Sequence, residues 1–595
     1  MRVAPIVRPG YDRAVEEGSA GGRAMGWSGR LRPAAVRSAA ARGAALLGAL
    51  VVMLGAWTGR AQPHQADTLV IGITQYPSTL HPMFDAMLAK SYVLALGRRP
   101  FTVYDASWKL VCLLCVELPT LENGGAERIA LDDGRAGIAV TYSIHPDARW
   151  GDGTPVSVRD VQFAYEVGRR PESGVSNLEL YRRILKVEVH DDRRFTLHVD
   201  RVTYQYNAIT DFAVLPEHLE RAAFAEPANY RQRSLYETQP AHAGLYFGPY
   251  RVTGVTPGAE IVLERNPTWW GKPPAFKRIV VKVIENTAAL EANLLSGAVD
   301  YVAGELGLSL DQALAFEKRH AQRFDVQFKP GLIYEHIDLN LDNPLLKDRR
   351  IRQALILGLD REAISKQLFE GRQPVADGSI SPLDRMRAGD LPRWRYDPKR
   401  AAALLEEAGW TLKDRWRQNE RGERLRFELM TTAGHRVREL VQQVLQSQWR
   451  QLGIDVRIRN EPARTFFGET VSKRQFGAMA MFAWSSAPEN VPRTTLHSQQ
   501  IPSASNNWAG QNYTGFADAE MDQLLDTIEI ELDEEKRRPM WRRIEEIYVT
   551  ELPALPLYFR ADPFIIPKWL KGVVPTGHQF PTTLWVEDWR VEPTN

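Results

Sequence analysis

The stretch Gly248–Gly271, GPYRVTGVTPGAEIVLERNPTWWG, constrains the fold most strongly, because it sets two turn signals around short apolar runs. Gly248-Pro249 and Pro257-Gly258 are turn pairs, since proline fixes φ and glycine tolerates positive φ. The runs Tyr250–Val255 and Ile261–Leu263 therefore predict the two strands of a β-hairpin. The stretch has no nucleophile, base or metal-ligand set, so we interpret it as scaffold.

The length of the chain, 595 residues, is too great for one compact core, and about 150 residues per domain suggest three or four units. Its composition, 44% hydrophobic and 25% charged, is ordinary for a globular protein. A formal net charge of +2 without a basic domain argues against nucleic-acid binding. Two cysteines exclude a disulfide scaffold and a cysteine-based zinc cluster.

The first 61 residues are predicted to be a leader. The apolar run Gly43–Trp57 follows several arginines and is shorter than the roughly 20 apolar residues of a membrane span. This pattern favours a secretory signal cleaved after Ala61, with an uncleaved anchor as the alternative. Met1 or Met25 could be the true start. No cysteine follows the apolar run directly, so lipoprotein anchoring is not supported.

The segment Ala148–Phe163, ARWGDGTPVSVRDVQF, predicts a turn followed by a capped helix. Asp152-Gly153 is a turn pair, Ser157 is a helix N-cap, and Asp160 stands in the position of the capping-box glutamate. A structural role for both carboxylates is therefore favoured over a catalytic one.

Further elements follow from apolar periodicity. Buried strands are expected at Leu69–Ile73, Ile279–Val283 and Phe476–Trp484. Helices are expected at Ala288–Leu295, Lys347–Ile364, Tyr396–Gly409, Val437–Leu452 and Asp518–Thr527. Pro539 is expected to kink or start the helix that contains it.

Cys112 and Cys115 form a C-x-x-C motif within KLVCLLCVELPT. A redox role would need a helix N-terminus to lower a thiol pKa. The leucine and valine neighbours instead favour a strand with the two thiols on opposite faces, acting as small buried hydrophobes. A periplasmic disulfide is the alternative.

Several motifs resemble those of the extracytoplasmic solute-binding proteins of ABC importers, family 5, the dipeptide/oligopeptide-binding family. Gly248–Gly271 resembles the family's G-P-Y turn and its strand ending R-N-P-x-Y-W-G, with Trp269 in place of the tyrosine. Trp150–Phe163 agrees throughout with W-x-D-G-x-P-V-(T/S)-x-x-D-V-x-(F/Y), and Leu294–Asp300 and Tyr396–Gly409 resemble further family motifs. Because the matches run in order from about residue 67 to 575, the chain is identified as a member of this family.

The resemblance implies a two-lobed α/β fold, the type II (cluster C) periplasmic-binding-protein fold, with an extra subdomain in the first lobe. Tyr334–Asn340 resembles the strand that crosses between the lobes. The implied boundaries are residues 1–61 for the leader, 62–335 for lobe I with an inserted subdomain at about 110–230, 336–545 for lobe II, and 546–595 for the return to lobe I.

The resemblance also implies a function without covalent chemistry. The chain would be the periplasmic substrate-binding component of an ABC importer, a monomer that binds peptides in an interlobe cleft without cofactor or metal. Its partners would be a peptide or other small solute and the permease and ATPase complex at the inner membrane. Binding of a nickel complex, opine, sugar or haem is the alternative. A periplasmic hydrolase is less favoured, because G-x-S-x-G, H-E-x-x-H and a dense His/Asp cluster are missing from the sequence.

The ligand-binding residues implied by the resemblance lie in two loops: Tyr76, Pro77, Trp484, Ser485, Glu489, Asn490 and Arg493. Peptide binders of the family carry W-x-x-D in the second loop, where the aspartate holds the peptide amine. Trp484 aligns with the tryptophan, but Ala487 stands where the aspartate would be. A buried ammonium without a carboxylate is costly. Either Glu489 therefore takes that role, or the ligand lacks a free amine.

Overall fold

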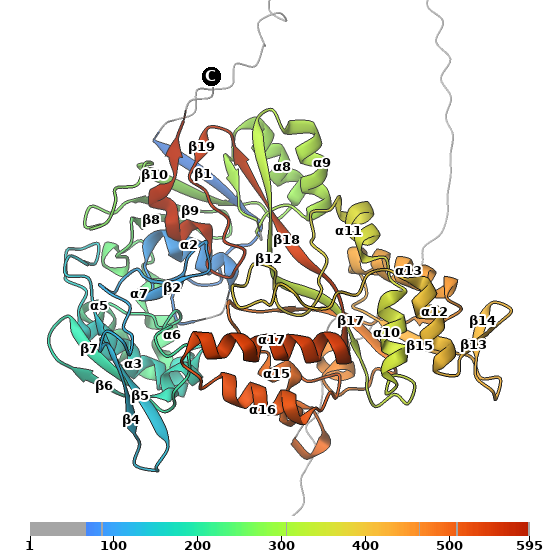
Figure 1. Ribbon diagram of the computed structural model, residues 1–595. Helices are drawn as coiled ribbons and strands as arrows, with labels where there is room; N and C mark the ends of the chain where they lie inside the picture. The colour runs from blue at the N-terminus through green and yellow to red at the C-terminus, as the bar shows by residue number, and fades with distance from the viewer. Residues whose placement is uncertain (1–66, 85–86, 305, 463–464, 507–509, 593–595) are drawn as a thin grey trace, which may run out of the picture. The chain divides into compact units, whose positions relative to one another are not determined.

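The structure, a computed structural model, describes residues 67–84, 87–304, 306–462, 465–506 and 510–592 (Figure 1). The predicted leader, with its apolar run Gly43–Trp57, lies outside these residues. Across the described part of the chain, every helix is too short or too polar to cross a bilayer.

A mixed ten-stranded sheet organises the described chain, with the strand order β16-β15-β17-β12-β18-β11-β1-β10-β9-β8. Its strands are β1 (Thr68–Ile73), β8 (Tyr250–Thr256), β9 (Glu260–Arg265), β10 (Arg278–Val283), β11 (Tyr301–Val302), β12 (Phe324–Leu339), β15 (Arg426–Met430), β16 (Asp455–Ile458), β17 (Met479–Ser485) and β18 (Ala554–Pro567). β8 and β9 pair antiparallel, and Gly258 in their turn has a φ of 74°. The predicted hairpin is therefore confirmed.

The long strands β12 and β18 run antiparallel to each other and connect two apolar cores (Figure 1). Their register shifts between Pro330 and Tyr334. The larger core is built mainly from residues 69–303 and 564–589, and the second from residues 337–481 and 552–558. The predicted crossing segment, Tyr334–Asn340, lies where β12 enters the second core.

A separate antiparallel sheet has the order β4-β5-β7-β6. It consists of β4 (Ala126–Ala130), β5 (Ala136–Ser143), β6 (Ile184–Val189) and β7 (Arg194–Val199), with α3 (Val158–Gly168) and α4 (Leu178–Arg183) beside it. Ser157 and Asp160 form the predicted capping box at α3. The buried Asp160 carboxylate also accepts hydrogen bonds from the Trp150 indole at 3.1 Å and the Glu217 amide at 2.9 Å. Its role is structural.

The other principal helices are α2 (Leu88–Gly97), α8 (Thr287–Ser296), α9 (Leu310–His320), α10 (Arg349–Leu357), α11 (Arg361–Phe369), α12 (Pro398–Glu407), α13 (Arg436–Gln451), α16 (Ala519–Ile528) and α17 (Glu534–Glu551). Shorter elements are β2 (Thr102–Tyr104), β3 (Leu110–Cys112), β13 (Thr411–Lys413), β14 (Trp416–Gln418), β19 (Leu570–Lys571), β20 (Arg590–Val591), α5 (Glu217–Glu220), α6 (Tyr230–Arg233), α7 (Leu235–Thr238) and α15 (Arg493–Leu496). α17 begins five residues before Pro539, so this proline lies inside the helix and does not start it.

The predicted helix Lys347–Ile364 is wrong as a single helix, because the chain breaks it into α10 and α11. Gly358 caps the end of α10, and the Asp360 carboxylate starts α11 by accepting from the Ala363 amide at 2.8 Å. A Cβ atom on Gly358 would lie 2.4 Å from a methyl carbon of Leu452. Glycine therefore lets the end of α10 pack closely against the chain after α13.

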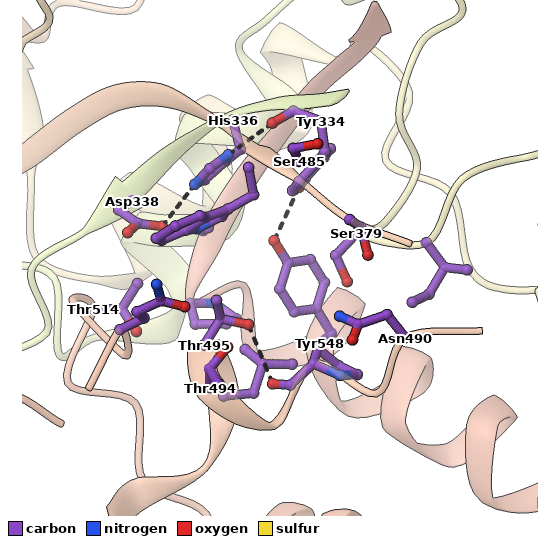
Figure 2. A pocket seen from close by; sticks show the side chains of 18 residues that line it. Tyr334, His336, Asp338, Ser379, Ser485, Asn490, Thr494, Thr495, Thr514 and Tyr548 are labelled. Atoms are coloured by element: carbon purple, nitrogen blue, oxygen red, sulfur yellow. Dashed lines mark hydrogen bonds and ion pairs between the residues drawn. The ribbon is translucent and has the colours of Figure 1, made fainter. Parts of the chain in front are cut away.

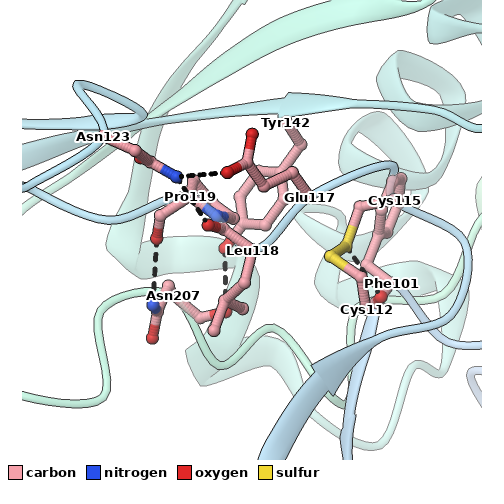
Figure 3. The surroundings of a disulfide bond; sticks show 9 residues. All are labelled: Phe101, Cys112, Cys115, Glu117, Leu118, Pro119, Asn123, Tyr142 and Asn207. Carbon is pink, nitrogen blue, oxygen red and sulfur yellow. Dashed lines mark hydrogen bonds between the residues drawn. A yellow bond between two sulfur atoms is a disulfide. The ribbon is translucent and has the colours of Figure 1, made fainter.

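The two cysteines form a disulfide, with their Cα atoms 5.2 Å apart (Figure 3). The favoured prediction of two thiols on opposite faces of one strand is wrong, because β3 ends at Cys112 and the chain turns before Cys115 pairs with Ile144. The alternative, a disulfide, is confirmed.

Removing this disulfide is expected to have a modest effect. It closes a very short loop, and the loop-entropy relation gives about 2 kcal/mol for a ring of this size. Chemical denaturation of a Cys112→Ala/Cys115→Ala variant should show a loss of this order. A loss above about 4 kcal/mol would contradict the entropic account, and the wild type under reducing conditions provides the matched control.

Candidate ligand-binding site

A cavity of about 110 Å³ opens where β12, β17 and α17 meet (Figure 2). β12 contributes Tyr334, His336 and Asp338, because alternate residues of a strand face the same side. The end of β17 contributes Trp484 and Ser485. The remaining lining residues are Ser379, Ile380, Ser486, Asn490, Pro492, Thr494, Thr495, Leu496, Gln511, Thr514, Tyr548, Pro553 and Ala554.

The lining of this cavity combines apolar surface with many neutral polar groups and is almost uncharged. Its hydroxyl groups belong to Tyr334, Ser379, Ser485, Ser486, Thr494, Thr495, Thr514 and Tyr548, and its carboxamides to Asn490 and Gln511. Among the described residues that line it, none is a lysine or an arginine, and Asp338 is the sole acid. Such a wall offers neutral donors and acceptors beside aromatic rings, which suits uncharged polar groups such as peptide amides.

His336 and Asp338 form a buried pair on this wall. His336 Nε2 lies 3.1 Å from Asp338 Oδ1, and His336 Nδ1 lies 3.2 Å from the Tyr334 carbonyl oxygen. The imidazole is stacked on the Tyr334 ring, with a centroid distance of 4.9 Å. Both ring nitrogens of His336 therefore lie near an oxygen of the chain itself, although Nε2 makes no hydrogen bond of good geometry.

Trp484 is held by its aromatic neighbours. Its ring stacks on Tyr513 at a centroid distance of 5.6 Å and meets the edge of Phe482 at 5.4 Å. These contacts fix the indole at the edge of the cavity, where the side chain is half-buried. A ring fixed in this way can pack against a ligand with little loss of conformational entropy.

The structure brings three of the predicted ligand-binding residues, Trp484, Ser485 and Asn490, onto this cavity. Tyr76 and Pro77 are not among its lining residues, and Tyr76 packs against the larger core. The side chain of Arg493 points to another partner, since its guanidinium lies 2.5 Å from Asp526 Oδ1. These side chains therefore do not share one surface in this structure.

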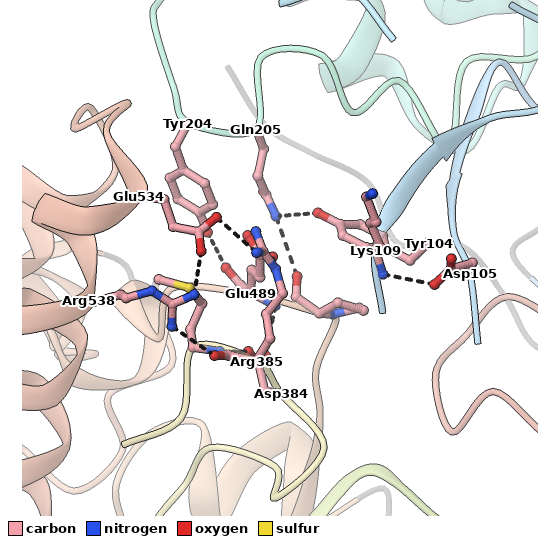
Figure 4. Close-up of polar contacts among 12 residues, drawn as sticks. Tyr104, Asp105, Lys109, Tyr204, Gln205, Asp384, Arg385, Glu489, Glu534 and Arg538 are labelled. Atoms are coloured by element: carbon pink, nitrogen blue, oxygen red, sulfur yellow. Dashed lines mark hydrogen bonds and ion pairs between the residues drawn. The ribbon is translucent and has the colours of Figure 1, made fainter. Parts of the chain in front are cut away.

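Glu489 lies in the loop that follows β17, and its side chain is buried (Figure 4). Its carboxylate pairs with Arg385, which also lies 2.9 Å from Glu534. Its amide donates to Asp384 Oδ2 at 2.9 Å, and its carbonyl accepts from the Tyr204 hydroxyl. With φ at 56°, Glu489 adopts the left-handed conformation that non-glycine residues rarely take. In this structure the carboxylate is paired with Arg385, and Glu489 is not among the lining residues of the cavity.

Comparison with known proteins identifies the family. The profile described as "Bacterial extracellular solute-binding proteins, family 5 Middle" matches residues 132–503. The chain belongs to this family. Family 5 relatives include the oligopeptide-binding protein AppA of Bacillus subtilis (strain 168), 25% identical over 521 residues, which cover 86% of this chain and 89% of AppA. The nickel-binding periplasmic protein of Escherichia coli (strain K12) is 25% identical over 424 residues, covering 70% and 78% of the two chains.

Solved structures of the family share the fold. The oligopeptide-binding protein from Thermus thermophilus, complexed with a pentapeptide, has a TM-score of 0.63 and 30% identity, covering 89% of this chain and 96% of that one. NikA from Brucella suis, in complex with Fe(III)-EDTA, has a TM-score of 0.71 and 20% identity, covering 88% and 100%. The predicted family and the periplasmic-binding-protein fold are both confirmed, and the family 5 chain is an extracytoplasmic solute-binding protein.

Sequence reasoning missed several cavity residues of this family 5 protein. His336 and Asp338 were read only as part of a crossing strand, although polar residues at every second position of an apolar strand are a signal for one polar face. Tyr548 and Thr514 come from segments more than 170 residues further along the chain. No local pattern connects those segments to β12.

Proposed function

We propose that this chain is the periplasmic substrate-binding component of an ABC importer, binding peptides for delivery to a membrane permease. The observation that carries the proposal is that one edge of β17, from Ala483 to Ser485, pairs with no strand of the described chain and lies beside the almost uncharged cavity. β17 pairs with β12 from Met479 to Ser485, but with β15 only at Met479 and Ala480. Within the described chain, the rest of that second edge pairs with no strand, although the Thr431 hydroxyl donates to the Met481 carbonyl at 2.7 Å, which leaves Ala483–Ser485 as the open part. An extended peptide can add there through main-chain hydrogen bonds, while the cavity receives a side chain.

The relatives support a peptide over the alternative ligands. A relative that is 30% identical was solved with a pentapeptide, whereas others are a nickel-binding periplasmic protein and NikA in complex with Fe(III)-EDTA. An anionic chelate needs positive charge, and the cavity lining described here has no lysine or arginine. Across the described residues, no cluster of three or more His, Cys, Asp or Glu side chains could hold a metal ion.

We infer that binding is coupled to movement of two lobes, residues 62–335 with 546–595 and residues 336–545. Two apolar cores support two lobes, but residues 552–558 pack in the second core, so the chain returns to the first lobe further along β18 than residue 545. The register shift between Pro330 and Tyr334 lies just before Ile337 and Leu339 of β12 enter the second core. Closure about crossing strands would bury a ligand between the lobes without altering it covalently. The proposal further includes export by the leader, cleavage after Ala61, and a monomer that docks on the permease and ATPase complex.

Native mass spectrometry of the purified protein, incubated with a mixture of tri- to pentapeptides, tests the proposed function. Peptides should be retained. Co-purification of a discrete non-peptide solute, with no peptide retained, would overturn the choice of ligand. Turnover of a bound amide or ester would overturn the proposal of a function without chemistry.

Replacing Trp484 with alanine is expected to weaken peptide binding by about tenfold, because an aromatic contact contributes about 0.5–1.5 kcal/mol beyond its buried area. Isothermal titration calorimetry with a retained peptide measures the change. Trp416→Ala is the matched control, since Trp416 is half-buried in the β13–β14 hairpin, away from the cavity lining. Equal losses in both variants would argue against a ligand contact at Trp484.

A further inference from the structure

A second cavity, of about 360 Å³, adjoins the first, and Asn490 lines both. One side is formed by the sheet β4-β5-β7-β6 together with residues 203–209. The opposite side is formed by Asn490, Val491 and Glu529. The two sides come from distant parts of the chain, so the cavity exists only where these parts meet.

We propose that this second cavity is a subsite for an apolar side chain of the peptide ligand, and that it selects longer peptides with an aliphatic residue at the distal end. The inference rests on the proposed function, because it assumes that a peptide occupies the first cavity. It adds a second recognition site, in which the four-stranded sheet contributes directly to ligand choice.

The chemistry of the second cavity differs from that of the first. Its floor is aliphatic, made by Ile138, Ile184, Leu197, Val199, Ile209 and Val491. Ile138, Ile184 and Leu197 are at most 2% exposed, so they form a firm wall that belongs to the larger core. The rim also carries charged and polar groups, from Arg183, Arg201, Gln205, Tyr206 and Glu529. A floor of this kind gains from burying an aliphatic side chain, whereas a serine at the same place would gain little.

Contacts beside Asn490 already hold the two sides of this cavity together (Figure 4). The Tyr204 hydroxyl donates to the Glu489 carbonyl, and the Tyr204 amide donates to the Glu529 carbonyl at 3.1 Å. The Arg537 guanidinium lies 4.6 Å from the centre of the Tyr204 ring. The second cavity is therefore a formed volume in this structure, in which contacts join its two walls.

The geometry of an extended peptide connects the two cavities. Successive residues rise by about 3.3 Å and their side chains alternate in direction. A peptide anchored along β17 would fill the first cavity with one side chain, and a longer one would continue past Asn490. The length and the apolar character of a ligand are therefore the two properties to vary.

The test compares trialanine with hexapeptides in which three alanines are joined to three leucines or to three serines, in both orders, by titration calorimetry. In at least one order, the leucine peptide should bind about tenfold more tightly than its serine counterpart. Ala208→Trp fills the second cavity, because Ala208 lines it. This variant should bring the leucine-to-serine ratio close to one while leaving trialanine binding unchanged.

Ala136→Trp is the matched control, since Ala136 is exposed on β5 and does not line the cavity. Val199→Trp is a second filling variant, and the melting temperatures of all variants establish that they are folded. A leucine-to-serine affinity ratio near one in the wild type would overturn the subsite but not peptide binding. So would a ratio that both filling variants leave unchanged. Retention of no peptide at all would overturn the proposed function and the subsite with it.

Discussion

Replacing Glu335 with glutamine is expected to destabilise the protein by about 3–5 kcal/mol, because removal of one partner leaves buried charges uncompensated. Glu335 is 1% exposed and joins three elements. On one side, Arg438 of α13 lies 3.1 Å from its Oε1. On the other, Arg560 of β18 lies 2.8 Å from the same oxygen. Burial acts to raise the pKa of Glu335, but Arg560 and Arg438 outweigh it and hold the pKa below the usual value.

Chemical denaturation near neutral pH measures this loss. Glu188→Gln is the control, because Glu188 forms an exposed pair with Lys186 at 2.7 Å and should change the free energy of unfolding by less than about 1 kcal/mol. The double variant Glu335→Leu/Arg438→Met should recover part of the loss, since apolar side chains can replace a buried ion pair. A loss below about 1 kcal/mol in Glu335→Gln would show that the network does not stabilise the crossing strands.

The ion pairs of Glu335 with Arg438 and Arg560 also support the first cavity, because Glu335 lies in the strand that forms one of its walls. Glu335 lies on β12 between Tyr334 and His336, both of which line the first cavity. Since side chains alternate along a strand, the carboxylate is directed away from the cavity and clamps β12 to α13 and β18. Buried charges of Glu335, Arg438 and Arg560 therefore lie behind the cavity wall, while Asp338 is the sole acid among the described residues of the wall itself.

Local signals in the sequence were enough to predict individual elements. The hairpin β8–β9 and the capping box of α3 depend on residues within a few positions of each other, such as Gly258 and the pair Ser157 and Asp160. The order of these motifs along the chain was enough to predict the family. A break such as that at Gly358 was not predictable locally, because its cause is contact with Leu452.

The candidate site was predictable only in part, because its residues are chosen by tertiary contacts. Trp484 was predicted at the end of a buried strand and Asn490 in the loop after it, and both residues line the cavity. The position of Glu489 depends on Arg385, more than 100 residues away, which turns its carboxylate from the ligand loop into an internal ion pair. The sequence alone does not show that Asp338 lines the cavity, because this depends on the pairing of β12 with β17.

A second large effect is expected in the pH dependence of stability, through Glu545 on α17. Glu545 is 3% exposed, and burial raises its pKa to about 8, although it accepts a hydrogen bond from the Ala388 amide at 2.7 Å. The folded protein thus binds this proton more tightly than the unfolded chain does. The contribution is complete below the unfolded pKa of about 4.3 and is lost as the pH rises towards 8, with a slope approaching 1.4 kcal/mol per pH unit.

Denaturation curves of the wild type and Glu545→Gln between pH 5 and pH 8.5 isolate this contribution. Asp562, whose pKa burial raises to about 6, adds a slope of the same sign to both proteins, so the difference between them is the measured quantity. The glutamine keeps an acceptor for the Ala388 amide but cannot ionise, and its stability advantage should grow with pH. Glu535→Gln, at a side chain on the same helix that is 84% exposed, should track the wild type. If the difference in unfolding free energy between the wild type and Glu545→Gln stayed constant across this range, Glu545 would be ionised in the folded protein. Nearby positive charge would then offset the cost of its burial.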